Sequence, residues 1–129
     1  MKIPELLAPA GNMEKAKIAI AYGADAIYLS GQLYGMRAGA GNFDNEQLAA
    51  VVKYAHDRGV KVYVTVNIIP HNQHLEGMPE YIAFLHKLGV DAIIVADVGV
   101  INIAKDAAPE LPLHLSTQAN TVNWQAARF

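Results

Sequence analysis

The chain has 129 residues, of which 53% are hydrophobic, and its 10 basic and 12 acidic residues give a net charge of −2. This length and composition suit one domain with a sizeable core. The near balance of charge gives no strong electrostatic footprint for nucleic acid, which disfavours, without excluding, RNA binding by this segment alone.

Cysteine is absent, which excludes disulfides, thiolate zinc sites, a Cys nucleophile and an iron–sulfur or other Cys-bound cofactor within these residues. The N-terminal apolar stretch is short and broken by prolines, and no run approaches the roughly 20 apolar residues that span a bilayer. We therefore expect a cytoplasmic protein without a membrane partner.

Apolar runs and helical patterns alternate along the whole chain. Continuous apolar runs predict parallel strands covered on both faces, at residues 5–8, 26–29, 60–66, 92–95 and 113–115. Stripes of apolar residues at helical spacing, with caps before them, predict helices over residues 13–22, 45–58, 79–88, 100–107 and 123–129. We expect Trp124 to pack the last of these helices onto the sheet.

Three segments are similar to one another: "YGADAIYLS" (22–30), "RGVKVYVTVN" (58–67) and "LGVDAIIVAD" (88–97). Their glycines recur at about the length of one βα unit, which indicates an α/β architecture. No glycine-rich phosphate loop follows the first strand, and the units are nearly equal in length. Residues 1–129 therefore predict four and a half βα units, the first half of a TIM-type (β/α)8 barrel. Because a closed barrel needs eight units, we expect a fragment of a longer chain.

In such folds the active site lies at the carboxyl ends of the strands. The polar residues expected there give four candidate catalytic residues, which are Asp97, Asn67, Ser116 and Gln118, and five candidate substrate-binding residues, which are Asn12, Arg37, Asn42, His71 and Asn120.

Several of these candidates have a second interpretation. A helix N-cap is the favoured role of Asn12 and an equal alternative for Asp97. Arg37 is either a solvated surface residue or a clamp for a carboxylate or phosphate. His71 and His74 offer two nitrogen ligands to zinc or iron, without a partnered Glu or Cys. The sequence lacks the H-E-x-x-H and G-x-S-x-G motifs of well-known hydrolases.

Five stretches carry a family resemblance: "PELLAPAGN", "YGADAIYLSGQLYGMRAGAGNF", "GVKVYVTVNIIPHN", "DAIIVADVGV" and "LHLSTQANTVNW". Together they resemble the N-terminal region of peptidase family U32, the collagenase-like proteins. They are most similar to the branch required for 5-hydroxyuridine formation at the tRNA wobble position, which is linked to prephenate. A sister branch is linked to hydroxylation of a cytidine in 23S ribosomal RNA. The family's signature cysteines lie downstream of the matched region.

The resemblance implies an RNA-modification enzyme, or a subunit of one, with tRNA as its partner and an unknown cofactor. A second hypothesis is a metal-dependent endopeptidase that acts on collagen-like substrates and uses His71 and His74. A third is a catalytically inert half-barrel that forms a homodimer through its open sheet edges.

Overall fold

The computed structural model describes residues 2–36 and 41–129. Its elements are β1 (Leu7–Pro9), α1 (Met13–Ala21), β2 (Ala26–Ser30), α2 (Asn45–His56), β3 (Lys61–Val66), α3 (Asn72–Leu75), α4 (Met78–Leu88), β4 (Ala92–Val95), α5 (Val98–Ala107), β5 (Leu113–Leu115), the 3₁₀ turn η1 (Thr117–Ala119) and α6 (Trp124–Arg128). The strands pair in the order β1-β2-β3-β4-β5, and every pair is parallel. The predicted α/β class, built from repeated βα units, is confirmed as a partial (β/α) barrel.

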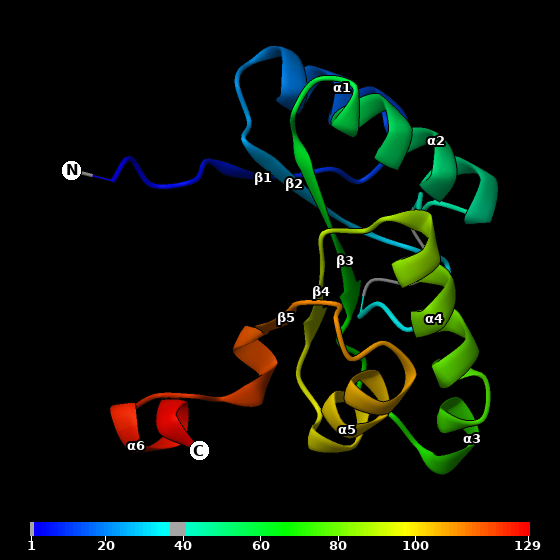
Figure 1. Cartoon of the computed structure of the whole chain (residues 1–129), viewed down its shortest axis with the longest axis vertical. Helices are drawn as coiled ribbons and strands as arrows, with labels where there is room; N and C mark the ends of the chain where they lie inside the picture. Colours follow the sequence, from blue (N-terminus) through cyan, green and yellow to red (C-terminus); the bar gives the residue numbers. More distant parts are fainter. Residues whose placement is uncertain (1, 37–40) are drawn as a thin grey trace.

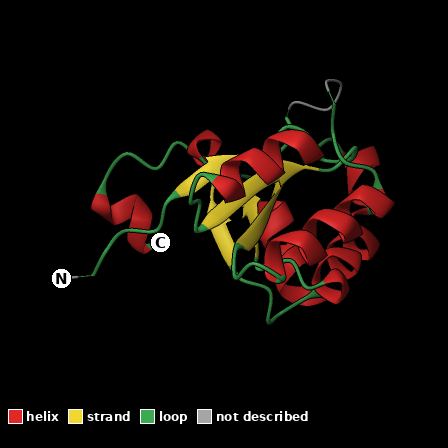
Figure 2. Ribbon diagram, turned by 90° about the horizontal axis from the view of Figure 1, so that it is seen from above, coloured by secondary structure: helices red, strands yellow, loops and turns green. Residues whose placement is uncertain are grey.

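The helices α1, α2, α4 and α5 cover one face of the curved sheet, while the other face is open (Figure 1; Figure 2). Side chains that alternate along the strands divide between these faces. Ile27, Val64 and Ile93 point toward the helices and are fully buried in the main core. On the opposite face Tyr28 is 36% exposed and His114 is also exposed. The open face is therefore the inner wall of the partial barrel.

Helix boundaries follow from local capping. In α2 the Asp44 carboxylate accepts a hydrogen bond from the Gln47 N–H, and the Gln47 side chain accepts one from the Asp44 N–H. This capping box satisfies two of the unpaired donors at the helix start. Helix α4 ends at Gly89, which has the left-handed φ of 88° that suits glycine.

Most of the predicted elements differ from the structure by one or two residues at their ends, and three differences are larger or have a clear cause. The first strand begins at Leu7 and not at residue 5, because the Leu6 N–H bonds the Asp25 carboxylate at 2.8 Å instead of a neighbouring strand. The short helix α3 was not expected. Trp124 is 67% exposed, and α6 stands away from the helical layer (Figure 1). The expected packing of Trp124 onto the sheet is wrong for this structure.

Two aspartates in the similar "GADA" and "GVDA" segments join the start of a strand to its neighbour. The Asp25 N–H donates to the Leu6 carbonyl at 2.9 Å, and the Asp91 N–H donates to the Val62 carbonyl at 2.9 Å. The Asp25 carboxylate in turn accepts a hydrogen bond from the Leu6 N–H, and the Asp91 carboxylate accepts one from the Val62 N–H, both at 2.8 Å. The Asp91 carboxylate also contacts His56 Nε2 at 2.8 Å. The repeated segments thus encode a reciprocal clamp between strands.

A polar cluster occupies the inner wall at the amino ends of the strands. The Tyr63 hydroxyl donates to the Glu5 carboxylate at 2.7 Å, and Lys61 Nζ lies 3.0 Å from the same carboxylate. His114 meets the Tyr63 ring edge-on, with centroids 4.6 Å apart. The Tyr63 hydroxyl and Lys61 lower the pKa of Glu5, while burial and Glu5 hold the pKa of Tyr63 well above its usual range.

Across residues 2–36 and 41–129, no helix combines the length and apolar character that crossing a membrane requires.

The hydrogen bonds of Asp91 lead us to expect that its replacement by alanine lowers the stability of the protein. Asp91→Ala leaves the N–H of the buried Val62 without its acceptor, so we expect the free energy of unfolding to fall by about 1–3 kcal/mol. Urea denaturation followed by circular dichroism measures the change. Asp106→Ala, on the exposed face of α5, is the matched control and should stay within about 0.5 kcal/mol. An Asp91→Ala protein as stable as this control would contradict the clamp.

The Glu5 cluster predicts a stability difference that depends on pH. A carboxyl whose pKa is lowered by folding stabilises the protein above its unfolded pKa of about 4.3, and this contribution is lost as the pH falls through the lower folded value. We therefore expect Glu5→Gln to be less stable than the wild type at pH 7, by less than about 1 kcal/mol because the pair is partly exposed. The difference should shrink toward zero below pH 4. Denaturation curves of both proteins that differ equally at pH 7 and pH 3 would refute the assignment.

Candidate functional site

The carboxyl ends of β3 and β5 bring three of the predicted site residues together. Asn67 follows β3, and Ser116 and Gln118 follow β5. Asn67 is 8% exposed and is the one buried polar side chain within the described parts of the chain. Its Nδ2 lies 3.4 Å from Ser116 Oγ and 3.4 Å from Gln118 Oε1, and the Ser116 hydroxyl donates to Gln118 Oε1. We call Asn67, Ser116 and Gln118 the amide cluster.

A backbone donor fixes the orientation of the Asn67 amide. The Met36 N–H donates to Asn67 Oδ1 at 3.2 Å. Because a backbone N–H can only donate, the atom that it meets is the Asn67 oxygen. The NH₂ group of Asn67 must then face Ser116 and Gln118, so Gln118 turns its own oxygen toward it. The Met36 contact thus determines which atom of each side-chain amide, Asn67 and Gln118, is oxygen and which is nitrogen.

The first part of the loop after β2, residues 31–36, contacts the end of β3 and the residues that follow it. We call the end of the partial barrel where the carboxyl ends of the strands lie the mouth. Besides the Met36 contact, the Ile68 N–H donates to the Tyr34 carbonyl at 3.1 Å. A Cβ added to Gly35 would lie 1.8 Å from Ser30 Oγ and 3.2 Å from Thr65 Oγ1, so this close approach requires glycine. At the far end of the loop, a Cβ on Gly41 would lie 3.6 Å from the Gly11 carbonyl of the β1 loop.

The sequence patterns did not identify Thr65 and Lys15 as residues of the mouth, whereas Ser30 was expected at the carboxyl end of its strand. Ser30 and Thr65 are register partners, and Thr65 lies two residues before Asn67 on the same strand. This period of two is the signal that would have found Thr65. Lys15 belongs to the β1 side, where its Nζ would lie 3.8 Å from a Cβ on Gly11. It places a cation near the end of β1, and the amide cluster itself is uncharged.

Two predicted site residues act as helix caps. The Asn12 side chain accepts a hydrogen bond from the Lys15 N–H at 2.9 Å and begins α1. The Asp97 carboxylate accepts one from the Val100 N–H at 3.1 Å and begins α5. Both caps lie on the loop side of the sheet, but no hydrogen bond to the amide cluster is recorded for either within the described ranges.

Two further candidates lie in the loops that follow β2 and β5. Asn42 is half-buried in the β2–α2 loop, and Asn120 is exposed, with a left-handed φ of 54° after η1. Arg37 lies outside the described residues.

His71 and His74 are adjacent, and one ring nitrogen is already engaged. The His71 N–H donates to His74 Nδ1 at 2.9 Å, and the two rings lie 5.6 Å apart. No group of three or more His, Cys, Asp or Glu side chains suited to a metal ion occurs in the described portion of the chain. The metal interpretation of these histidines stays a prediction.

The wall behind the β2–α2 loop is aromatic. Tyr34 packs against Tyr81 with centroids 5.2 Å apart, and Tyr81 packs against Phe84 at 6.4 Å. Burial raises the pKa of Tyr81 to about 12, and its hydroxyl has no hydrogen-bond partner in the described residues. Gly31 provides the space for this hydroxyl, because a Cβ there would lie only 2.2 Å from it.

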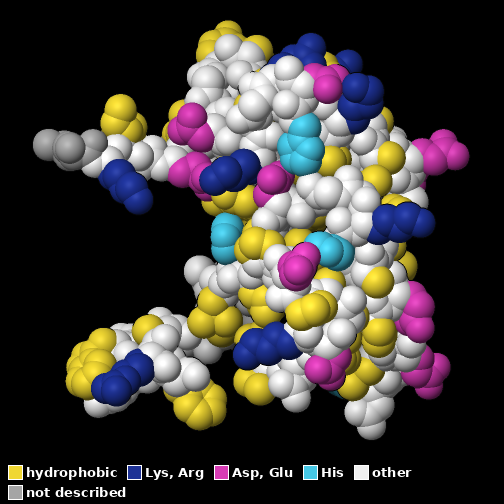
Figure 3. All heavy atoms as spheres, viewed as in Figure 1, with side chains coloured by type: hydrophobic (Ala, Val, Ile, Leu, Met, Phe, Trp, Pro, Cys, Tyr) yellow, Lys and Arg dark blue, Asp and Glu magenta, His cyan; other side chains and the backbone are white. Residues whose placement is uncertain are grey.

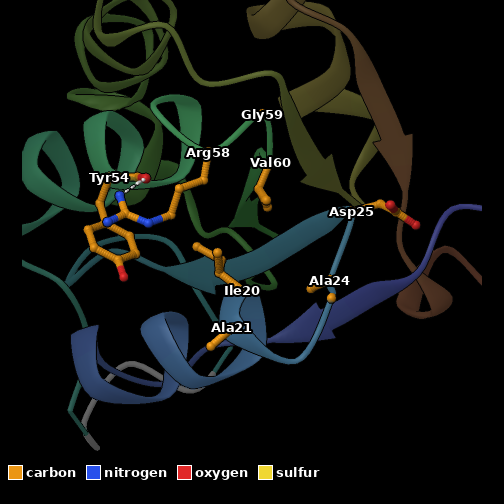
Figure 4. Close-up of a pocket in the computed structure, with 9 residues that line it drawn as sticks. Ile20, Ala21, Ala24, Asp25, Tyr54, Arg58, Gly59 and Val60 are labelled. Atoms are coloured by element: carbon orange, nitrogen blue, oxygen red, sulfur yellow. Dashed lines mark hydrogen bonds between the residues drawn. The ribbon is translucent and has the colours of Figure 1, made fainter.

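A hollow lies at the opposite ends of the strands, between the C-terminal ends of α1 and α2 (Figure 4). Arg58, which lines it, stacks on the Tyr54 ring at 3.5 Å and donates to the Tyr54 carbonyl at 3.0 Å. Lys17 also lies 5.4 Å from the centre of this ring. These contacts cap the end of α2, which is sufficient to explain the arginine.

Comparison with known proteins gives relatives of the whole chain. The chain is 48% identical over 128 residues to tRNA hydroxylation protein P1 of Bacillus subtilis. The aligned region covers 99% of this chain and 30% of that protein. It is 42% identical over 126 residues to tRNA hydroxylation protein P of Escherichia coli, covering 98% of this chain and 28% of that protein. The chain thus spans less than a third of the length of these two relatives.

A solved structure shares the fold. The U32 peptidase Mk0906 has a TM-score of 0.75 and 16% sequence identity, over 98% of this chain and 54% of that one. At this identity the likeness concerns the fold. The sequence profile described as peptidase family U32 matches residues 11–129, which is nearly the entire chain. The chain belongs to peptidase family U32.

Proposed function

We propose that the protein takes part in hydroxylation of a tRNA pyrimidine, namely uridine at the wobble position. The observation that carries this proposal is the 48% identity to a protein named for tRNA hydroxylation, which extends over 99% of the chain and so includes the whole amide cluster. The relatives are more than three times as long, so the reaction belongs to the longer protein of which they are examples. Its substrate is a cytoplasmic RNA.

The chemistry of the mouth is compatible with an uncharged, planar base. Asn67, Ser116 and Gln118 supply amide and hydroxyl groups, which recognise the polar edge of a base without a charge. A carboxylate such as that of prephenate needs a cation, and Lys15 beside the β1 loop is one candidate. Arg37, from the sequence, is a second. The two sides of the mouth thus suit two different ligands.

Hydroxylation of C5 replaces C–H by C–OH and removes two electrons from the base. Amides and hydroxyls are not oxidants, and this chain has no cysteine to hold a redox cluster. An oxidant and an oxygen donor must therefore come from a co-substrate or from another part of the protein. Within this chain we assign Asn67 and Gln118 to contact with the base and Ser116 to positioning Gln118. Asp97 and Asn12 shape the loops that begin α5 and α1.

The other hypotheses have less support. A metal-dependent endopeptidase needs further ligands beside His71 and His74, and no observation favours it. Homodimerisation through β1 and β5, the outer strands of the sheet, stays a prediction. The near-neutral net charge indicates that a basic surface for tRNA comes from outside these residues.

The proposal predicts a specific loss of modified tRNA. Deleting the gene in its own organism should abolish 5-hydroxyuridine and its derivatives in bulk tRNA, measured by liquid chromatography and mass spectrometry of nucleoside digests. Other modified nucleosides serve as internal controls, and a plasmid copy of the gene should restore the signal. If a paralogue is present, the deletion is made in a strain that also lacks it. Unchanged 5-hydroxyuridine in the deletion strain would refute the proposed function.

A further inference from the structure

The amide cluster has more hydrogen-bond donors than acceptors to offer a ligand. Asn67 Oδ1 already accepts the Met36 N–H, Ser116 Oγ faces Asn67 Nδ2, and Gln118 Oε1 faces both Asn67 Nδ2 and the Ser116 hydroxyl. Every acceptor oxygen of the cluster therefore has a donor. The Gln118 NH₂ group has no hydrogen bond recorded within the described residues.

The Asn67 donors can pass to a ligand by exchange of partners, because Gln118 Oε1 would keep the Ser116 hydroxyl as its donor. Their distances to Ser116 Oγ and Gln118 Oε1 are both 3.4 Å, at the long end of hydrogen-bond lengths. Since these bonds are weak, a better acceptor can replace them at small cost. Asn67 cannot rotate to present its oxygen instead, because the Met36 N–H would lose its acceptor. The cluster thus offers N–H donors, and its orientation is fixed.

A site of this kind selects a ligand that presents an oxygen acceptor. Uracil carries a carbonyl at C4, whereas cytosine carries an amino group, itself a donor, at the same position. A donor facing a donor leaves both groups unpaired, and buried polar groups without partners discriminate strongly between ligands. A carboxylate is the weaker fit, because no lysine or arginine is hydrogen-bonded to the cluster in the described part of the chain.

We propose that the Asn67 amide, oriented by Met36, donates to the C4 carbonyl of the target base with Gln118 beside it, and so selects uracil over cytosine. This inference rests on the proposed function. C4 is bonded to C5, so a donor at the C4 oxygen holds the carbon to be hydroxylated in a defined place. Asn67 and Gln118 are recognition residues in this role, and Ser116 positions Gln118.

Two substitutions of Asn67 separate recognition from loop positioning. Asn67→Asp retains an oxygen for the Met36 N–H but removes the NH₂ donors, whereas Asn67→Ala removes both. In strains whose chromosomal gene carries each change, we expect wobble 5-hydroxyuridine to fall at least tenfold in both. Gln118→Glu, at an exposed position that folding tolerates, should reduce it several-fold. Asn102→Asp, on the exposed surface of α5, is the matched control and should remain within twofold of wild type.

Binding provides the readout that a merely structural role would not change. Fluorescence anisotropy of the purified protein, at the full length its gene encodes, is measured with anticodon stem-loop RNAs that carry U or C at the wobble position. The wild type should bind the U form about tenfold more tightly, and Asn67→Asp should abolish that preference. Equal affinity of the wild type for both RNAs would overturn the inference, as would an Asn67→Asp protein with wild-type preference and wild-type hydroxylation.

The failures of the two proposals are distinguishable. If gene deletion removes 5-hydroxyuridine while Asn67→Asp and Gln118→Glu retain it, the proposed function stands and the recognition by Asn67 is wrong. If gene deletion leaves 5-hydroxyuridine unchanged, the proposed function itself is wrong.

Discussion

Parallel strand pairing is the constraint on which the rest of this structure depends. A parallel pair cannot be joined by a tight turn, so the chain must cross back through a helix after each strand. Here all four pairs are parallel and join strands that are consecutive in the sequence. Every strand therefore ends at the same edge of the sheet, and every loop that follows a strand opens there. This geometry brings Asn67 to Ser116, which is 49 residues away in the sequence.

The buried Asn67 converts that geometry into a specific chemical environment. An amide buried to this degree must satisfy both its oxygen and its nitrogen. The Met36 N–H satisfies the oxygen and joins the β2–α2 loop to β3, while Ser116 and Gln118 face the nitrogen from β5. One side chain thus connects three segments of the mouth. Its fixed orientation is the reason that the mouth presents donors to a ligand.

The elements that the sequence predicts best are those set by continuous burial. The strand β4 has the expected bounds, because its mostly buried apolar run lies between Asp91 and Asp97. The strand β5 also has the expected bounds although its residues are half-buried or exposed, because Pro112 and Ser116 flank it. The start of β1 was misplaced, since the Leu6 N–H takes a distant partner, Asp25, that no local pattern reveals. Trp124 was expected to pack, but its exposure depends on contacts that periodicity within a short helix does not determine.

The site was predictable in position more than in detail. Polarity at strand ends identified Asn67, Ser116 and Gln118, and the similarity of the "GADA" and "GVDA" segments marked Asp25 and Asp91 without showing their clamp. The orientation of the amide groups could not be predicted from the sequence, because it depends on a tertiary contact between Met36 and Asn67, which are 31 residues apart. Capping, a local property, could be weighed from sequence for Asn12 and Asp97, and the structure shows both as caps.

The most direct test of the central claim is the response of the Asn67 and Gln118 side-chain amide signals to nucleotides. Nitrogen–proton correlation spectra of the labelled protein, assigned through the Asn67→Asp and Gln118→Glu variants, are recorded during titration with uridine or cytidine monophosphate. The account predicts that uridine monophosphate shifts both NH₂ resonances, and that cytidine monophosphate at the same concentration shifts them far less. Equal shifts with the two nucleotides, or no shift with either, would contradict it.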